Sequence, residues 1–261
     1  MNLLVPAYGY PGTDRVLWDG LRRAADSLGH VIVNPGSGPG DVRDPAWVRE
    51  VSVLTDHGVP LLGYLDLAYS AKPVDAILAE AALWRRWYGV TDFFLDCTPS
   101  SDAGRAAEVA DALRTSARCG ELVANPGTTT LPEVAAHFDL VVDHEGGPPL
   151  TRLGPEAVDF WPRDRGDDTG EAGGGARQGA PAKSWIVHGT DRAGAHTSLV
   201  AARMAGVAEI WVTDLAGDNP YRTLPAYWSW LLEQLAVVPL SGSEPMGVSR
   251  LAGRRQDRDA S

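Results

Sequence analysis

Residues 60–96 read P-L-L-G-Y-L-D-L-A-Y-S-A-K-P-V-D-A-I-L-A-E-A-A-L-W-R-R-W-Y-G-V-T-D-F-F-L-D and contain one complete unit of the predicted fold. The short apolar runs at 60–64 and 92–95 are typical of buried strands. Between them, residues 73–88 repeat apolar side chains at helical spacing, after a proline that a helix tolerates in its first turn. This order predicts two parallel strands joined by a crossover helix.

The same unit recurs along the chain. Eight apolar or β-branched runs lie at 3–6, 30–33, 60–64, 92–95, 121–124, 140–143, 184–187 and 209–212. Further helices are predicted at 14–28, 103–117 and 193–205. An open doubly wound sheet would use the same units, so the number of runs is what favours closure. We therefore predict an α/β chain that forms a single (β/α)8 TIM-type barrel.

The length agrees with one barrel, because the chain has 261 residues and such barrels typically need roughly 250. We assign residues 1–240 to the barrel. Residues 163–181 carry no large apolar side chain, which predicts a flexible insertion after the sixth strand. Such an insertion either hangs over the catalytic face or is tolerated without a role. Residues 241–261 are predicted to be a disordered tail.

The composition excludes several classes of partner and site. A net charge of -11 repels phosphate backbones, so no nucleic acid is expected. No apolar run approaches the roughly 20 residues that span a bilayer, so no membrane is expected. Cys97 and Cys119 are too few for a disulfide framework or a structural zinc site. The start lacks an export signal, which predicts a cytoplasmic protein, or a secreted one if the true start lies upstream.

Candidate site residues are the polar side chains that follow the strands, because barrels place their active sites at the carboxyl ends of strands. They are Tyr8, Tyr10, Asn34, Tyr64, Asp66, Tyr69, Asp96, Asn125, Asp143, His144, Glu145, His188 and Asp214. Carboxylates, amides and tyrosines suit a sugar, whose ring faces stack on aromatic side chains while its hydroxyls pair with polar groups. A carbohydrate is therefore the expected ligand.

The sequence lacks the motifs of several other active sites. The glycine-rich stretch N-P-G-S-G-P-G at 34–40 has no lysine for phosphates and is interpreted as a turn at the pocket rim. No histidine pair has the spacing of H-E-x-x-H, and no G-x-S-x-G elbow occurs. We predict no metal and no cofactor.

Six motifs in order carry a family resemblance. They are L-L-V-P-A-Y-G-Y-P at 3–11, N-P-G-S-G-P-G at 34–40, G-Y-L-D-L-A-Y at 63–69, W-Y-G-V-T-D-F-F-L-D at 87–96, N-P-G-T at 125–128, and V-T-D with N-P-Y-R-T-L-P-A-Y-W at 212–228. Together they resemble the spherulin 4, or spherulation-specific family 4, proteins. The resemblance implies a (β/α)8 barrel related to glycoside hydrolases, some of whose fungal relatives cut galactosamine-rich exopolysaccharides.

The resemblance also implies catalytic carboxylates. In the hydrolytic relatives, the strand-four motif ends in an Asp-Glu pair and a further Glu follows strand six. Asp96 and Glu145 match the first and last of these groups, whereas Cys97 stands at the second. We expect Asp96 to stabilise or attack the anomeric carbon and Glu145 to be the acid, with the two roles interchangeable. Separations of about 5 to 5.5 Å for retention and about 6.5 to 9.5 Å for inversion are both within reach.

Three functions compete. The leading prediction is a glycoside hydrolase that acts on an amino-sugar-containing, galactosamine-type poly- or oligosaccharide. The alternative is a non-catalytic carbohydrate-binding barrel that has lost the carboxylate at the position of Cys97. The third is a different chemistry in which Cys97 is a nucleophile near His144.

Overall fold

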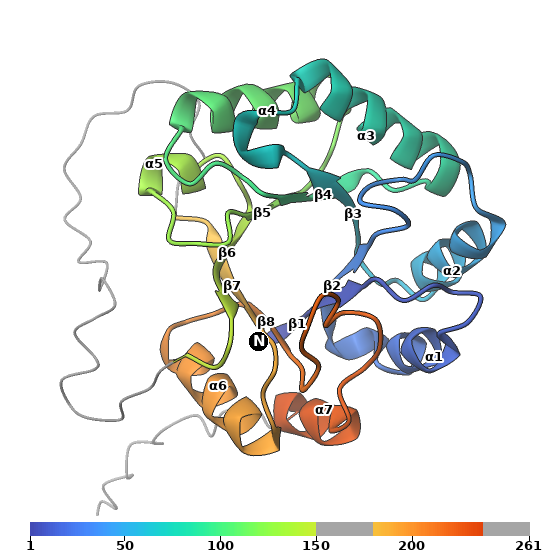
Figure 1. Cartoon of the computed structure of the whole chain (residues 1–261), viewed down its shortest axis with the longest axis vertical. Helices are drawn as coiled ribbons and strands as arrows, with labels where there is room; N and C mark the ends of the chain where they lie inside the picture. The colour runs from blue at the N-terminus through green and yellow to red at the C-terminus, as the bar shows by residue number, and fades with distance from the viewer. Residues whose placement is uncertain (150–179, 237–261) are drawn as a thin grey trace, which may run out of the picture.

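The computed structural model describes residues 1–149 and 180–236. The predicted insertion at 163–181 falls almost entirely outside these residues, and the predicted tail at 241–261 lies wholly outside them. Eight parallel strands form a closed barrel in which each strand pairs with the next in sequence and the last pairs with the first (Figure 1). They are β1 (Asn2–Ala7), β2 (Leu28–Val33), β3 (Leu61–Asp66), β4 (Asp92–Asp96), β5 (Leu122–Asn125), β6 (Leu140–Gly146), β7 (Ala182–Val187) and β8 (Glu209–Val212). The prediction of a (β/α)8 barrel is confirmed.

Helices surround this barrel on the outside (Figure 1). The α-helices of the described residues are α1 (Arg15–Arg23), α2 (Pro45–Asp56), α3 (Val74–Tyr88), α4 (Ala103–Thr115), α5 (Pro132–Ala135), α6 (Arg192–Met204) and α7 (Trp228–Ala236). Two short 3-10 helices, η1 (Ala25–Ser27) and η2 (Ala68–Ser70), complete the set. None of these helices is long and apolar enough to cross a membrane.

The helix predicted at 14–28 is too long. It ends at Arg23, and β2 begins at Leu28, so Leu28 and Gly29 belong to a strand. The pairing of β1 with β2 shifts register at this point, and a Cβ atom at position 29 would lie 2.1 Å from Oε1 of Glu209. The glycine is needed for the close approach of this carboxylate.

A charged cluster closes the end of the barrel where the strands begin. Nδ1 of His30 lies 3.0 Å from Oε1 of Glu209, and Nε2 lies 3.2 Å from Oε2 of Glu121. Burial opposes the charge on His30, but the hydrogen bonds to the two carboxylates prevail and raise the pKa of His30 to about 10. His30 is therefore a cation at neutral pH and ties β2, β8 and the start of β5 together.

Trp84 on α3 packs against β3 and binds its backbone. Its indole Nε1 donates a 2.9 Å hydrogen bond to the carbonyl oxygen of Tyr64. A Cβ atom at position 63 would lie 2.8 Å from the Trp84 ring, so Gly63 allows the ring to lie directly against the strand. This contact holds the backbone that carries Tyr64 toward the carboxyl end of the barrel.

Candidate active site

Asp96 and Glu145 are joined through one amide group. They lie at the ends of β4 and β6, and Asn125 ends β5 between them. The Asn125 Nδ2 atom donates to Oδ1 of Asp96 at 2.9 Å and to Oε2 of Glu145 at 2.6 Å. Because the two bonds share one nitrogen, the two carboxylate oxygens are at most about 5.5 Å apart. The structure thus brings together the two residues predicted to be catalytic.

Two tyrosines bind the remaining carboxylate oxygens. The Tyr64 hydroxyl donates to Oδ2 of Asp96 at 2.5 Å, and the Tyr221 hydroxyl donates to Oε1 of Glu145 at 2.7 Å. Each of the four carboxylate oxygens therefore accepts a hydrogen bond. Tyr64 belongs to β3, whereas Tyr221 comes from the segment between β8 and α7.

Tyr8 directly follows β1 and lies beside these two tyrosines. Its ring meets Tyr64 edge to face at 5.9 Å between centroids, and Tyr221 in the same way at 5.3 Å. Burial is the largest cause of its raised pKa, and the negative charge of Asp96 adds to it. Burial also raises the pKa values of Tyr64 and Tyr221, so all three phenols stay protonated at neutral pH.

Burial is also the main reason why the pKa of Asp96 is raised above its usual range. Hydrogen bonds from Tyr64 and from the Cys97 amide oppose this effect, and the nearby charges of Glu145 and Asp66 reinforce it. Asp96 therefore keeps its proton to a higher pH than an ordinary aspartate, as a general acid requires.

The backbone beside Asp96 adopts an uncommon conformation. Cys97 has a φ of 51°, and Ala68, Tyr69 and Ser70 have φ values of 47°, 50° and 85°. The two loops are paired, because the Tyr69 amide donates to the carbonyl oxygen of Cys97 at 2.9 Å. Left-handed conformations of residues other than glycine cost free energy and often accompany functional sites. This turn leaves Tyr69 at the surface, with 64% of it exposed.

The arrangement does not support Cys97 as a nucleophile. Burial, followed by the charge of Asp96, raises the pKa of the Cys97 thiol to about 11, so the thiol is neutral at pH 7. Its side-chain partners are Tyr69 and Asp66. His144 instead lies 3.0 Å from the carbonyl oxygen of Gly147 and contacts the ring of Trp185.

Among the predicted sugar contacts, four have their partners outside the carboxylate pair. Asn34 accepts a 3.0 Å bond from the Gly38 amide within its own glycine-rich turn, and Asp214 accepts one of 3.0 Å from the Ala226 amide. These side chains shape the loops that carry them. The remaining two are Tyr10, which interacts with Asp44, and His188, whose amide binds the carbonyl oxygen of Gly146.

Tyr221 is the cluster residue that sequence reasoning missed. It lies in the N-P-Y-R-T stretch at 219–223, well beyond the end of β8, whereas the predicted site residues lie at or shortly after strand ends. Its place in the last of the six motifs is the signal that could have identified it.

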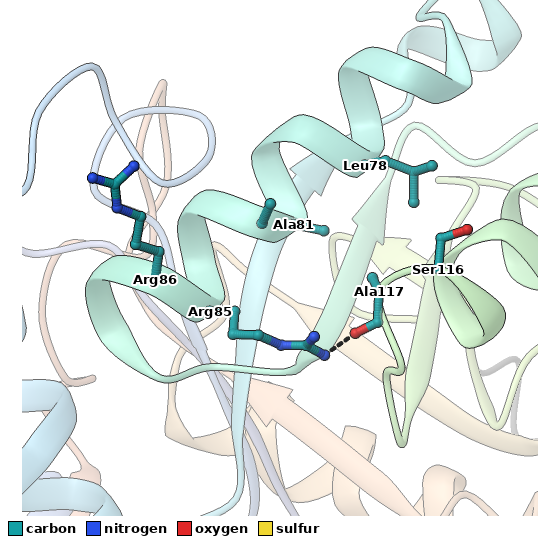
Figure 2. A pocket seen from close by; sticks show the side chains of 7 residues that line it. Leu78, Ala81, Arg85, Arg86, Ser116 and Ala117 are labelled. Carbon is teal, nitrogen blue, oxygen red and sulfur yellow. Dashed lines mark hydrogen bonds between the residues drawn. The ribbon is translucent and has the colours of Figure 1, made fainter.

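A separate hollow of about 260 Å³ lies between α3 and α4 (Figure 2). Its lining is mostly apolar, including Leu78 and Ala81, and the Arg85 guanidinium donates to the carbonyl oxygen of Ala117 at its edge. Arg85 and Ala117 precede β4 and β5, so this hollow lies toward the opposite end of the barrel from the carboxylates. Among residues 1–149 and 180–236, no group of three or more His, Cys, Asp or Glu side chains could hold a metal ion.

Comparisons with known proteins agree with this architecture. A model of the spherulation-specific family 4 matches residues 2–235. Spherulin-4 of Physarum polycephalum is 27% identical over 243 residues, which are 88% of this chain and 68% of that protein.

Two solved structures share the fold. Aspergillus clavatus Sph3 in complex with GalNAc superposes with a TM-score of 0.71 at 23% identity, covering 90% of this chain and 96% of Sph3. The Bacillus cereus spore cortex-lytic enzyme SleL gives a TM-score of 0.50 at 10% identity, covering 89% of this chain and 74% of SleL.

Proposed function

This chain belongs to the spherulation-specific family 4, and on that premise we propose that it is a glycoside hydrolase acting on an amino-sugar-containing, galactosamine-type poly- or oligosaccharide. One observation carries the proposal, namely the Asp96 and Glu145 carboxylates held by a shared bond donor, Asn125. Glycoside hydrolysis needs such a pair on either side of the scissile bond.

The choice of sugar rests on charge and on a structural relative. The structure of Sph3 was solved with GalNAc bound. The net charge of -11 attracts a glycan that carries free amino groups. Carboxylates and tyrosine rings together match the polar edges and apolar faces of a sugar ring.

The spacing favours a retaining mechanism. The inner oxygens of the two carboxylates lie within about 5.5 Å of each other, which is nearer to the about 5 to 5.5 Å of retaining pairs than to the about 6.5 to 9.5 Å of inverting pairs. The raised pKa of Asp96 makes it the acid and leaves Glu145 as the nucleophile, which exchanges the two roles first expected.

The proposed reaction has two steps. Asp96 gives its proton to the glycosidic oxygen while Glu145 attacks the anomeric carbon, so the glycosidic C–O bond breaks and an ester to Glu145 forms. Water then attacks the same carbon and gives its proton to Asp96, which frees Glu145 and restores the acid.

Reducing-end release from galactosamine- and glucosamine-containing oligosaccharides tests this proposal. Turnover by the wild type should be lost in Asp96→Asn and in Glu145→Gln. Glu108→Gln is the matched control, because Glu108 is an exposed carboxylate that pairs with Arg105. Binding of these sugars without turnover by the wild type would instead support the non-catalytic barrel.

Cys97→Glu separates the same two functions. A decayed enzyme should gain hydrolysis when the carboxylate is restored, whereas an enzyme that already uses Asp96 and Glu145 should gain little. We expect a change of less than about threefold, which corresponds to well under 1 kcal/mol of barrier.

A further inference from the structure

Three tyrosines from distant parts of the chain surround the carboxylate pair. Two of their hydroxyls are engaged by carboxylates, while the Tyr8 hydroxyl makes no hydrogen bond to any residue that the structure describes. We propose that Tyr64 and Tyr221 are positioning residues that hold Asp96 and Glu145, and that Tyr8 donates its hydroxyl to the bound sugar. This inference rests on the proposed function and extends it to the roles of individual tyrosines.

Tyr64 is held on two sides before it reaches Asp96. The Trp84 indole binds its carbonyl oxygen, and its ring packs against Phe94 with 6.2 Å between centroids. The backbone contact and the ring contact therefore hold the Tyr64 hydroxyl in position to donate to Oδ2 of Asp96. The bond also lowers the pKa of Asp96 against the effect of burial, so that the acid can still release its proton.

Tyr221 is fixed through its backbone. Its amide donates to Oδ1 of Asn219 at 3.1 Å, and its carbonyl oxygen accepts a 3.1 Å bond from the Tyr8 amide. The segment between β8 and α7 is thereby fastened beside β1 (Figure 1). From this position the hydroxyl orients Oε1 of Glu145 while Asn125 orients Oε2.

Tyr8 lies between these two rings and close to both carboxylates. The charges of Asp96 and Glu145 add to burial in raising the pKa of its phenol, so the hydroxyl remains a donor at any working pH. A sugar placed between the carboxylates offers hydroxyl and ring oxygens to such a donor. The Tyr8 hydroxyl donates to none of the four carboxylate oxygens in the described residues, and a bound sugar would supply the acceptor.

Several groups face Asp96, and their charges must stay constant in any test of its titration. The titratable and charged groups that face it are Glu145, Asp66, Cys97, Tyr8, Tyr64, Tyr69 and Tyr221. Tyrosine-to-phenylalanine changes remove one hydroxyl and leave the charges of this set intact.

The experiment compares Tyr8→Phe, Tyr64→Phe and Tyr221→Phe with the control Tyr227→Phe. Tyr227 is a suitable control because its hydroxyl donates to the carbonyl oxygen of Thr190 and, in residues 1–149 and 180–236, to no carboxylate. Two readouts need no turnover: the affinity for N-acetylgalactosamine and galactosamine by calorimetry, and the titration of the Asp96 carboxyl by 13C NMR, assigned with Asp96→Asn. A third readout is kcat and KM on galactosamine-containing oligosaccharides.

Each variant has its own expected signature. Tyr8→Phe should weaken sugar binding about five- to tenfold, the value of one neutral hydrogen bond, and leave the Asp96 titration unchanged. Tyr64→Phe should move the Asp96 titration to higher pH while sugar affinity stays within about threefold of the wild type. Tyr221→Phe should lower kcat about tenfold or more with KM within about threefold. Tyr227→Phe should match the wild type in all three readouts.

A different result would refute the role proposed for each tyrosine. Wild-type affinity in Tyr8→Phe, an unmoved Asp96 titration in Tyr64→Phe, or wild-type kcat in Tyr221→Phe would each refute the corresponding role. If the wild type neither binds nor hydrolyses these sugars, the roles of Tyr8 and Tyr221 fall with the proposed function. The Asp96 titration would still decide the role of Tyr64 in that case.

Discussion

Tyr221 donates a 2.7 Å hydrogen bond to Glu145 across 76 residues of sequence. The bond connects the segment that follows β8 to the end of β6, on the other side of β7. A carboxylate held in this way keeps one orientation, which reduces the entropy that must be lost when the substrate reacts. The site is therefore preorganised by contacts among strand ends and by one long loop.

Asn125 should contribute substantially to activity. Asn125→Ala removes the bond donor shared by both carboxylates, so we expect kcat/KM to fall about tenfold to a hundredfold, or about 1.4 to 2.7 kcal/mol of transition-state stabilisation. Kinetics together with circular dichroism would check this. Asn34→Ala is the control, because Asn34 accepts its bond from the Gly38 amide within its own loop. Equal losses in the two variants would show that the bridge has no special role.

Asp96 should make the fold less stable as the pH rises. Its pKa is raised in the folded protein, so the folded state binds more protons than the unfolded state, and stability falls as the pH rises above the unfolded value of about 3.9. Asp96→Asn removes this dependence. The stability of the variant relative to the wild type should therefore be greater at pH 7 than at pH 3. Denaturant titrations at both pH values measure it, and a difference that does not change with pH would refute it.

The pKa of His30 is also raised in the folded protein, so its contribution to stability falls with rising pH as well, but over a higher pH range. Its folded pKa of about 10 exceeds the unfolded value of about 6.5, so its contribution is complete below about pH 6.5 and is lost as the pH rises toward 10. His30→Gln should cost about 3 kcal/mol at pH 6, because Glu209 and Glu121 lose their cation, and less at pH 10. Thermal unfolding across this range, with exposed His57→Gln as control, would check it. A pH-independent cost would contradict the charged cluster.

Cys97 should be slow to alkylate at neutral pH. With a pKa of about 11, very little thiolate exists at pH 7, and the labelling rate should rise steeply between pH 8 and 10. Iodoacetamide labelling followed by mass spectrometry, in a Cys119→Ala background, measures this rate. Rapid labelling at pH 7 would revive the nucleophile hypothesis.

The sequence was sufficient to predict the barrel because each strand and helix leaves a local signal. The eight strands of the structure match the eight runs to within a few residues, since buried parallel strands are short, apolar and regularly spaced. The helix at 14–28 was extended too far because Leu28 fits a helical pattern equally well. Only the contact of Gly29 with Glu209, which is 180 residues away along the chain, shows that the strand has begun.

The site was predictable where its residues directly end a strand, as Asp96 and Asn125 do. The contact of Tyr221 with Glu145 could not be predicted, because a long loop brings Tyr221 back to the barrel. Nor could the contact of Asp214, whose carboxylate accepts a hydrogen bond within that same loop. Such pairings depend on how a loop folds back on itself, and residue spacing along the chain does not record this.

The most direct test of the account is the stereochemistry of the first product. Time-resolved 1H NMR of a galactosamine oligosaccharide digest by the wild type, with Asp96→Asn and Glu145→Gln as blanks, reports the anomer released before mutarotation. The close carboxylate pair predicts retention of configuration and no product from either variant. An inverted product, or equal turnover in the two variants, would contradict the assignment of Asp96 and Glu145 as the catalytic pair.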